Sequence, residues 1–307
     1  MAEKTLTSAP RNPSRGFFDR EHWRSHGALR LVRRYTPFWM RRVLRSPYLI
    51  GLDGLDLVLG RRKELVPPRY LNYAGFGGFT EAGQEFLKYF KDLCGLQPDH
   101  RVLDIGCGIG RMAVPLTSYL TTGSYEGLDI VPSGIRWCQQ NITRKFPRFR
   151  FQVTNVYNKQ YNPSGKCQPA DYQLPFADQE FDLVFLSSVF THMLPADLEH
   201  YIAEISRVLR PGGRCLFTFF LLDEEARRGL TSGTSALKFD YALTGCWTTD
   251  PVTPETAVAY DEGNIAPLLK RYSLSLDGIH PGAWSGRSAY LSYQDIVVGT
   301  KASANGH

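Results

Sequence analysis

The sequence predicts an α/β fold built on a doubly wound, mostly parallel sheet. From about residue 100 onward, short apolar runs alternate with amphipathic helical patterns. This alternation is typical of parallel strands joined by crossover helices. The 307 residues, of which 43% are hydrophobic and 21% charged, suffice for one large domain with additions or for two modest domains.

The expected elements follow one another along the chain. The expected strands are 101–106, 125–130, 149–157, 181–188, 214–222, 272–279 and 293–301. The expected helices are 79–96, 111–120, 133–143 and 195–210. The last of these is the clearest helix, because Pro195 opens it and an apolar stripe runs along it. The stretch 222–271 exceeds what a crossover needs, so part of it is expected to form a cap.

The N-terminal residues carry the positive charge. Residues 1–50 contain eleven Lys/Arg and three Asp/Glu, a local balance of +8, so the remaining 257 residues sum to −2 within the net charge of +6. Two short helices are expected over about 27–46, separated at Pro37. We expect residues 1–80 to form a basic helical extension with a lid, 81–301 the main domain, and 302–307 a tail.

The basic stripe at 30–45 has three interpretations. It is a solvated helix face, a surface for anionic lipid or for a phosphorylated acceptor, or, least favoured, a nucleic-acid contact. The six cysteines form no CxxC pair, and the first residues lack an apolar signal core. The longest apolar run is too short to span a bilayer. We therefore expect a cytoplasmic protein, with peripheral membrane contact as an option, and no metal.

The stretch "VLDIGCGIG", residues 102–110, points to a nucleoside ligand. Gly106, Gly108 and Gly110 alternate after an apolar strand, and such a loop lets a ligand approach the backbone closely. A dinucleotide fingerprint needs a third glycine where Arg111 stands. Arg111 therefore argues against NAD or FAD, and the motifs that follow the loop decide which other ligand is favoured.

Five motifs in order resemble the class I, Rossmann-like S-adenosylmethionine-dependent methyltransferases. They are the glycine loop after Asp104, "YEGLDI", "QVTNVY", "LPFADQEFDLVFLSSVFTHM" and "LRPGGRCLF", which together cover about 100–220. The whole chain, including "NYAGFGGF" and "YQDIVVG", is similar to bacterial members. The resemblance implies a seven-stranded sheet with an antiparallel last strand, S-adenosylmethionine as cofactor, and S-adenosylhomocysteine as product.

The resemblance also implies cofactor contacts. Asp104 would accept a hydrogen bond from the cofactor ammonium, Asp129 would accept both ribose hydroxyls, and Asn155 would meet the adenine edge. The loop and the lid would complete the site. The expected cofactor-binding residues are Asp104, Gly106, Cys107 (through its backbone), Gly108, Gly110, Arg111, Asp129, Ile130, Asn155, Val156, Ser187, Tyr73 and Phe76.

His192 is the candidate catalytic residue. It follows the fourth strand, and a neutral imidazole could take a proton from a substrate hydroxyl. The alternative is that His192 is a structural hydrogen-bonding residue. The candidate substrate contacts lie in the aromatic lid and in the loop between the last two strands, and they are Tyr70, Phe79, His280, Trp284 and Arg287.

The function predicted from the sequence is O-methylation of a small metabolite, sugar or lipid. A hydroxyl acceptor benefits from a base, whereas a carboxyl acceptor needs none. An RNA or protein methyltransferase that docks through the basic N-terminus is an alternative, disfavoured because "SSVF" replaces an NPPY-like tetrapeptide. A non-catalytic S-adenosylmethionine-binding regulator is another alternative, and an NAD enzyme is the last.

Overall fold

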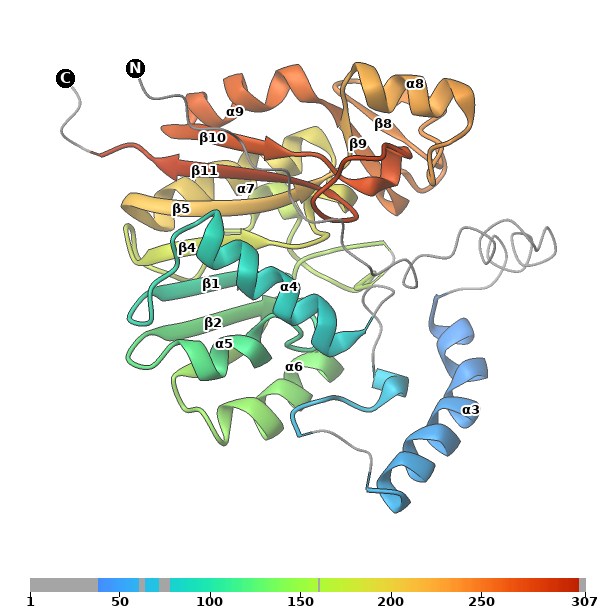
Figure 1. Ribbon diagram of the computed structural model, residues 1–307, viewed down its shortest axis with the longest axis vertical. Coiled ribbons are helices and arrows are strands. Elements are labelled where there is room, and N and C mark those ends of the chain that lie inside the picture. The colour runs from blue at the N-terminus through green and yellow to red at the C-terminus, as the bar shows by residue number, and fades with distance from the viewer. Residues whose placement is uncertain (1–37, 61–63, 72–77, 160, 304–307) are drawn as a thin grey trace.

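A seven-stranded sheet forms the centre of the protein (Figure 1). The computed structural model describes residues 38–60, 64–71, 78–159 and 161–303. The strands run in the order β10-β11-β5-β4-β1-β2-β3. Their bounds are β1 (Arg101–Ile105), β2 (Ser124–Asp129), β3 (Phe149–Val153), β4 (Phe181–Leu186), β5 (Leu209–Phe219), β10 (Leu274–His280) and β11 (Asp295–Lys301). Only β11 runs antiparallel to its neighbours in this sheet, which confirms the predicted fold class.

Helices cover both faces of the sheet. On one face lie α4 (Phe79–Asp92), α5 (Ala113–Tyr119) and α6 (Pro132–Cys138), and on the other α7 (Pro195–Val208) and α9 (Ile265–Arg271). Alternate residues of a strand enter opposite cores. Val102 packs in the core under α4 and α5, whereas Leu103 packs in the core under α7. A sheet buried on both faces explains the nearly continuous apolar strands of the sequence.

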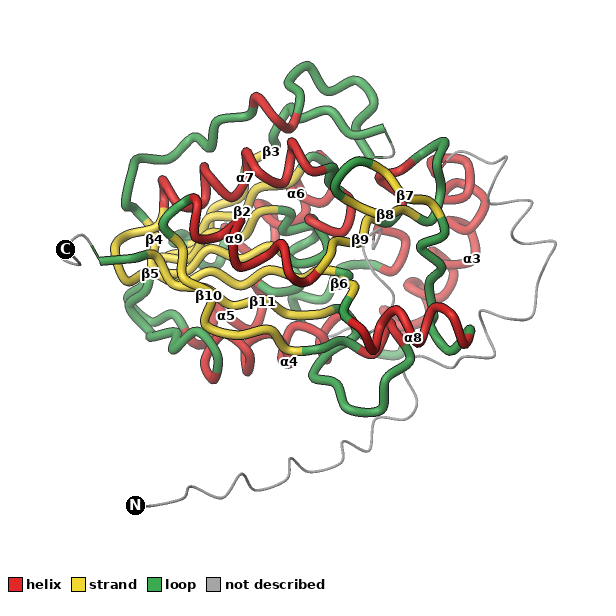
Figure 2. The backbone as a smooth tube through the Cα atoms, turned by 90° about the horizontal axis from the view of Figure 1, so that it is seen from above, coloured by secondary structure: helices red, strands yellow, loops and turns green. Residues whose placement is uncertain are grey.

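A second, four-stranded sheet lies beyond the carboxyl ends of the parallel strands (Figures 1 and 2). It contains β6 (Leu221–Leu222), β9 (Val258–Asp261), β8 (Cys246–Thr248) and β7 (Tyr241–Leu243), with α8 (Glu224–Ser232) beside it. A core of its own gathers Phe220, Phe239 and Trp284. These elements fall largely within the expected cap at 222–271, although α9, also within that range, packs on the main sheet. The division of the chain into domains stays a prediction.

The helix α3 (Phe38–Val58) precedes the main domain. It is one helix that contains Pro47 and runs to Val58, so the expected end near residue 46 was wrong. The first of the two expected helices lies outside the described residues. α3 is held by Arg69, in the short 3₁₀ helix Arg69–Leu71, which pairs with Asp56 at 2.5 Å. None of the helices that the structure describes is long and apolar enough to cross a membrane.

Candidate cofactor and acceptor site

The glycine loop joins β1 to α5 with three left-handed residues. Gly106, Gly108 and Gly110 have φ of +85°, +58° and +77°, a region that side-chain-bearing residues rarely adopt. The N–H groups of Gly106 and Cys107 donate to the Leu128 carbonyl at 2.8 and 2.9 Å. The loop is therefore held against the end of β2, with little space for side chains.

Packing adds a second reason for glycine. A Cβ at Gly106 would lie 2.3 Å from Cγ2 of Val189, and a Cβ at Gly110 would lie 2.7 Å from Cδ1 of Ile142. Both distances are far below van der Waals contact. The spacing of glycines that the sequence shows is thus required by this fold, whatever ligand the loop holds.

Asp129 joins the glycine loop to the segment that follows β2, with one carboxylate oxygen for each. Its Oδ2 accepts the N–H of Gly108 at 2.8 Å, and its Oδ1 accepts the N–H of Val131 at 2.8 Å. Asp129 is 9% exposed at the end of β2. Each carboxylate oxygen has a second lone pair, so this group can also accept ligand hydroxyls.

Asp104, at the end of β1, is a buried carboxyl beside the loop. Its Oδ2 accepts a hydrogen bond of 2.5 Å from the Tyr125 hydroxyl. Burial raises the pKa of Asp104 to about 8; the Tyr125 hydrogen bond opposes this shift and the nearby Asp129 charge adds to it. Asp104 is therefore largely protonated at neutral pH in the ligand-free protein. A ligand cation beside it would favour its charged form.

Tyr125 was not predicted as the partner of Asp104. Tyr125 occupies a fully buried strand position, where an aromatic residue looks like ordinary core. The hydroxyl of Tyr125 was the only sign of a polar contact in the sequence, because a buried phenol needs a hydrogen-bond partner.

Cys107 is buried, whereas Arg111 is partly exposed. Burial raises the pKa of the Cys107 thiol well above its ordinary value, which removes it as a nucleophile and agrees with a backbone role. Arg111 is partly exposed, and burial lowers the pKa of its guanidinium. Gly83 of α4 packs against the Arg111 carbonyl, where a Cβ would approach to 2.5 Å.

The expected adenine contacts lie near the ends of β2 and β3. Ile130 is partly exposed, Asn155 is exposed and Val156 is buried. The backbone carbonyl of Asn155 accepts the N–H groups of Lys166 and Cys167 at 3.1 Å each. The Asn155 side chain is therefore placed at the surface beside a tight chain reversal, and its contact with adenine stays a prediction.

The end of β4 carries a constrained serine pair. Ser187, the expected carbonyl donor toward the ammonium, is partly exposed. Ser188 has φ of +58°, and its N–H donates to the Thr218 hydroxyl at 2.7 Å while its own hydroxyl donates to Gln294 at 2.9 Å. A left-handed non-glycine residue is strained by about 1 kcal/mol, and such strain often occurs at functional sites. Ser188 was not among the predicted site residues.

His192 lies in the 3₁₀ turn Phe190–His192 after β4, and its imidazole is fixed by the cap. Its Nδ1 lies 2.8 Å from the backbone carbonyl of Glu255. Burial lowers the pKa of His192, with the Glu255 and Thr256 carbonyls opposing the shift. A carbonyl only accepts, so the neutral ring donates from Nδ1 and carries its basic lone pair on Nε2.

Two buried oxygens next to this histidine find no hydrogen-bond partner among the described residues. They are Oγ1 of Thr191, which is fully buried, and Oε2 of Glu255. Buried polar atoms are normally paired, so unpaired ones indicate a missing polar group. Thr191 precedes His192 in the chain, and Glu255 supplies the backbone carbonyl that the imidazole contacts, so we take this region as the candidate acceptor site.

Two of the four lid residues lie in described segments. Tyr70 is partly exposed in the short helix next to α3, and Phe79 is buried at the start of α4 in the core of the main domain. The two expected cofactor contacts of the lid, Tyr73 and Phe76, lie outside the described residues.

Two candidate substrate contacts in the loop between β10 and β11, Trp284 and Arg287, are buried in the protein. Trp284 has no exposed surface, and its indole N–H donates to Oδ2 of Asp295 at 2.6 Å. Arg287 is 8% exposed and pairs with Asp223 at 2.8 Å. Direct substrate contact by either residue would require this loop to open. His280 is partly exposed, and burial lowers its pKa.

Asp295 organises this loop and was not predicted. Its carboxylate accepts the N–H groups of Leu221 and Gly282, at 2.7 and 2.6 Å, besides the Trp284 indole. Asp295 thereby joins the start of β11 to β6 and to the loop. A charged residue at the start of the apolar run "DIVVGT" was the available signal.

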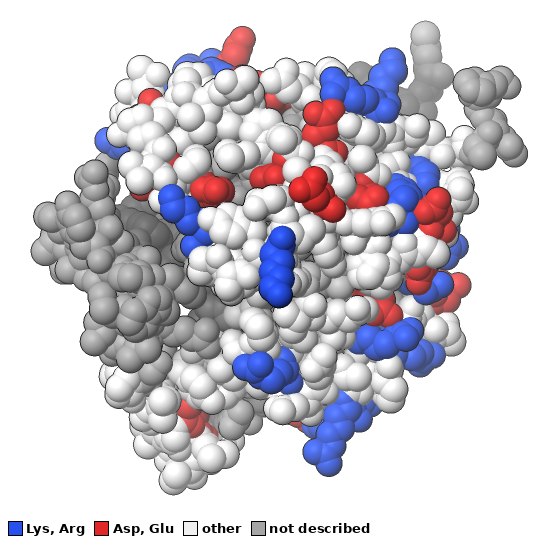
Figure 3. All heavy atoms as spheres, turned by 180° about the vertical axis from the view of Figure 1, so that it is seen from behind, with Lys and Arg blue, Asp and Glu red and all other residues white. Residues whose placement is uncertain are grey.

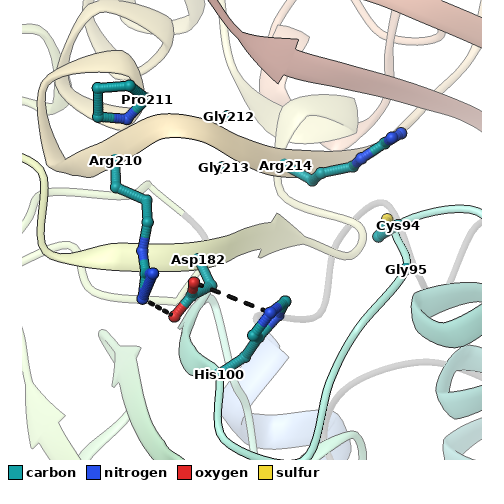
Figure 4. A pocket seen from close by; sticks show the side chains of 9 residues that line it. All are labelled: Cys94, Gly95, His100, Asp182, Arg210, Pro211, Gly212, Gly213 and Arg214. Atoms are coloured by element: carbon teal, nitrogen blue, oxygen red, sulfur yellow. Dashed lines mark hydrogen bonds and ion pairs between the residues drawn. The ribbon is translucent and has the colours of Figure 1, made fainter. Parts of the chain in front are cut away.

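A separate pocket of about 360 Å³ opens at the opposite end of the main sheet (Figure 4). His100 and Arg210 both face Asp182 there, at 3.9 and 2.5 Å. This pocket lies at the amino ends of β1 and β4, far along the strands from the glycine loop, and it contains none of the predicted site residues.

Comparison with known proteins agrees with this geometry. Residues 103–217 match the family described as "Methyltransferase domain". This part of the chain is a methyltransferase domain. The domain contains the glycine loop, Asp129 and His192, and ends in β5, so the resemblance found in the sequence is confirmed.

The curated relatives match over the same region. A phthiotriol/phenolphthiotriol dimycocerosates methyltransferase of Mycobacterium ulcerans is 36% identical over 118 residues, covering 38% of this chain and 36% of the relative. A fatty-acid O-methyltransferase of Mycolicibacterium smegmatis is 34% identical over 118 residues, with the same coverage. The matched region spans about a third of the length of these relatives.

Among solved structures, a protein from Pyrococcus horikoshii is 16% identical with a TM-score of 0.49, covering 72% of this chain and 90% of that chain. A SAM-dependent methyltransferase from Methanosarcina mazei is 23% identical with a TM-score of 0.46, covering 68% and 95%.

Proposed function

We propose that this protein transfers a methyl group from S-adenosylmethionine to an oxygen atom of a lipid, with a hydroxyl as the favoured acceptor. The observation that carries the proposal is the hydrogen bond between His192 Nδ1 and the Glu255 carbonyl, because it leaves a basic nitrogen on Nε2. This contact joins the methyltransferase domain to the cap. The site residues assigned below are part of the proposal.

The residues present fit S-adenosylmethionine. Asp104 is a buried carboxyl whose interaction partners include no cation among the described residues, and the ligand ammonium would supply one. Asp129, whose carboxylate lies at the end of β2 beside the loop, would accept the ribose hydroxyls. The Gly106–Gly110 loop offers close backbone approach without side chains. Asn155 and Val156 would bound the adenine.

The chain's own groups then direct the reaction. When bound, S-adenosylmethionine supplies a methyl group on a cationic sulfur and leaves as S-adenosylhomocysteine. His192 takes the acceptor's hydroxyl proton at Nε2 as the new carbon–oxygen bond forms. The low pKa of His192 keeps it neutral, and therefore able to act as a base, at pH 7. The Thr191 hydroxyl and the Glu255 carboxylate would bind the polar end of the acceptor.

The lipid class of the acceptor is supported by relatives. Those compared here are named for dimycocerosates and for fatty acids, both lipids. A carboxyl acceptor, as in the fatty-acid enzyme, is the second candidate, and it needs no base. Dependence on His192 separates the two, since only the hydroxyl reaction requires proton removal.

The test uses S-adenosylmethionine with a deuterated methyl group. The protein is incubated with a long-chain alcohol, a long-chain fatty acid, a bacterial lipid extract and an RNA and protein fraction, each separately, and the label is located by mass spectrometry. Label in the alcohol or in lipid hydroxyls, lost in His192→Ala, is expected. Label only in RNA or protein, or binding of S-adenosylmethionine without transfer to any acceptor, would refute the proposal.

A further inference from the structure

The outer side of α3 is apolar. Most of the large apolar side chains in the second half of this helix and just after it are strongly exposed, at 72% for Tyr48, 52% for Ile50, 53% for Leu55, 61% for Leu57, 84% for Val58 and 49% for Leu59. We call these six residues the α3 apolar surface. Several strongly exposed apolar side chains within one short segment of a water-exposed protein usually mark a contact with another apolar surface.

The polar residues of the same helix face inward. Asp53 and Asp56 pair with Arg69 at 3.4 and 2.5 Å, and both carboxylates are more buried than the α3 apolar surface. Oδ2 of Asp53 is buried. The two acidic residues of this half of α3 are therefore partly buried, as Leu49 and Leu52 are, while its other large apolar residues are exposed.

The arrangement removes negative charge from the outer side of the helix. Three arginines, at positions 41, 42 and 45, precede the α3 apolar surface in the same helix, and residues 1–50 carry a net charge of +8. An apolar helix surface in a chain whose first fifty residues carry a net charge of +8 matches an anionic bilayer, which offers negative headgroups above an apolar interior.

The position of α3 matches a membrane substrate. Figures 1 and 2 both show α3 on the side of the molecule toward which the carboxyl ends of the parallel strands point, the side of the glycine loop and the cap. Seen from behind in Figure 3, basic and acidic residues are interspersed over the main body. A bilayer touching α3 would face the candidate acceptor site.

We infer that α3 is a membrane-docking helix that inserts Tyr48, Ile50, Leu55, Leu57, Val58 and Leu59 into the surface of an anionic lipid bilayer. A second copy of the chain fits less well, because pairing two α3 helices would bring together two segments of charge +8. The inference goes beyond methyl transfer, and docking requires no turnover.

The experiment measures binding of the full-length protein to vesicles by co-sedimentation. One vesicle contains phosphatidylcholine alone, and the other contains phosphatidylcholine with about a third phosphatidylglycerol. The test variant carries Ile50→Ser, Leu57→Ser and Val58→Ser. The matched control carries Tyr241→Ser, Leu243→Ser and Val252→Ser, three exposed apolar residues outside α3. Calorimetric binding of S-adenosylhomocysteine and circular dichroism show that each variant folds.

The wild type and the control should bind the anionic vesicles and release them at high salt, while the test variant loses at least about tenfold in affinity. Failure of the wild type to bind, or equal binding by test variant and control, would overturn the inference. Dimerisation of the wild type that the test variant abolishes, without vesicle binding, would assign the surface to a second copy instead. Absence of S-adenosylhomocysteine binding by the wild type would count against the proposed function and leave the vesicle result intact.

Discussion

Replacing Asp104 with asparagine should stabilise the ligand-free protein at neutral pH and weaken its binding of S-adenosylhomocysteine. Asparagine has nearly the same shape, can accept the Tyr125 hydrogen bond and never ionises. In the wild type, ionisation of this buried carboxyl without a neighbouring cation destabilises the folded protein. Stability and ligand binding are therefore expected to change in opposite directions in this variant.

The size of the effect follows from the pKa of Asp104. Its value in the folded protein is raised from the ordinary 3.8 to about 8, so the stability that this group contributes is present below pH 4 and is lost as the pH rises through 8. Each pKa unit corresponds to about 1.4 kcal/mol, so the advantage of Asp104→Asn should grow by about 4 kcal/mol between pH 5 and pH 8. Because this side chain is 1% exposed, solvent does little to screen the effect.

The assay is urea unfolding of the ligand-free wild type and variant at several pH values from 5 to 8. An exposed carboxyl just before β1, in the control Asp99→Asn, should leave the pH dependence unchanged. Calorimetry at pH 7 should show a proton released when S-adenosylhomocysteine binds the wild type, and none for Asp104→Asn, whose affinity falls by about ten- to a hundredfold. A stability difference that stays constant with pH would refute this account of Asp104.

Three further outcomes follow from the contacts described above. Gly106→Ala must place a Cβ 2.3 Å from Val189 at φ +85°, and should lower the free energy of unfolding in urea by roughly 3 kcal/mol. The control Gly233→Ala, at φ +73° with nothing within 4 Å of the new Cβ, should lower it by about 1 kcal/mol. Equal losses in the two variants would show that the glycine loop rearranges to make room for the methyl group. His192→Ala should lower the rate of methyl transfer to a hydroxyl acceptor by about 10²- to 10⁴-fold. In the wild type this rate should fall only at pH values below the ordinary histidine pKa, because protonation of His192 removes the base. A midpoint of the pH–rate profile above pH 7 would exclude this role. Asp295→Ala leaves three buried N–H donors without their acceptor. Thermal unfolding should therefore show a loss of stability of roughly 3 kcal/mol or more. A loss under about 1 kcal/mol would mean that water replaces the carboxylate.

Local sequence patterns predicted the main sheet and the positions of the loop residues. Fully buried parallel strands need continuous apolar runs, and left-handed turns need glycine, so both leave a signature within a few neighbouring residues. Gly106, Gly108 and Gly110 and the end of β2 at Asp129 could be located for this reason. The pairing of Asp129 with the loop N–H of Gly108 follows from the same strand-end geometry.

Contacts between distant segments could not be predicted in this way. The carbonyl that sets the tautomer of His192 belongs to Glu255, 63 residues further along. A backbone carbonyl is present in every residue, so the sequence contains no sign of it. Trp284 was a candidate substrate contact in a turn-rich loop, yet it packs against Phe220 and Phe239 in the cap core, and Asp295 accepts its indole N–H.

The sequence by itself determined the fold class, the methyltransferase domain and the glycine loop, because each depends on residue type and short-range spacing. Tertiary structure alone decided which polar groups are buried together: Asp104 with Tyr125, His192 with the cap, and the acidic residues of α3 with Arg69. The reason is physical. Burial and its effects on charge depend on what the rest of the chain places around a side chain, and no local pattern records those neighbours.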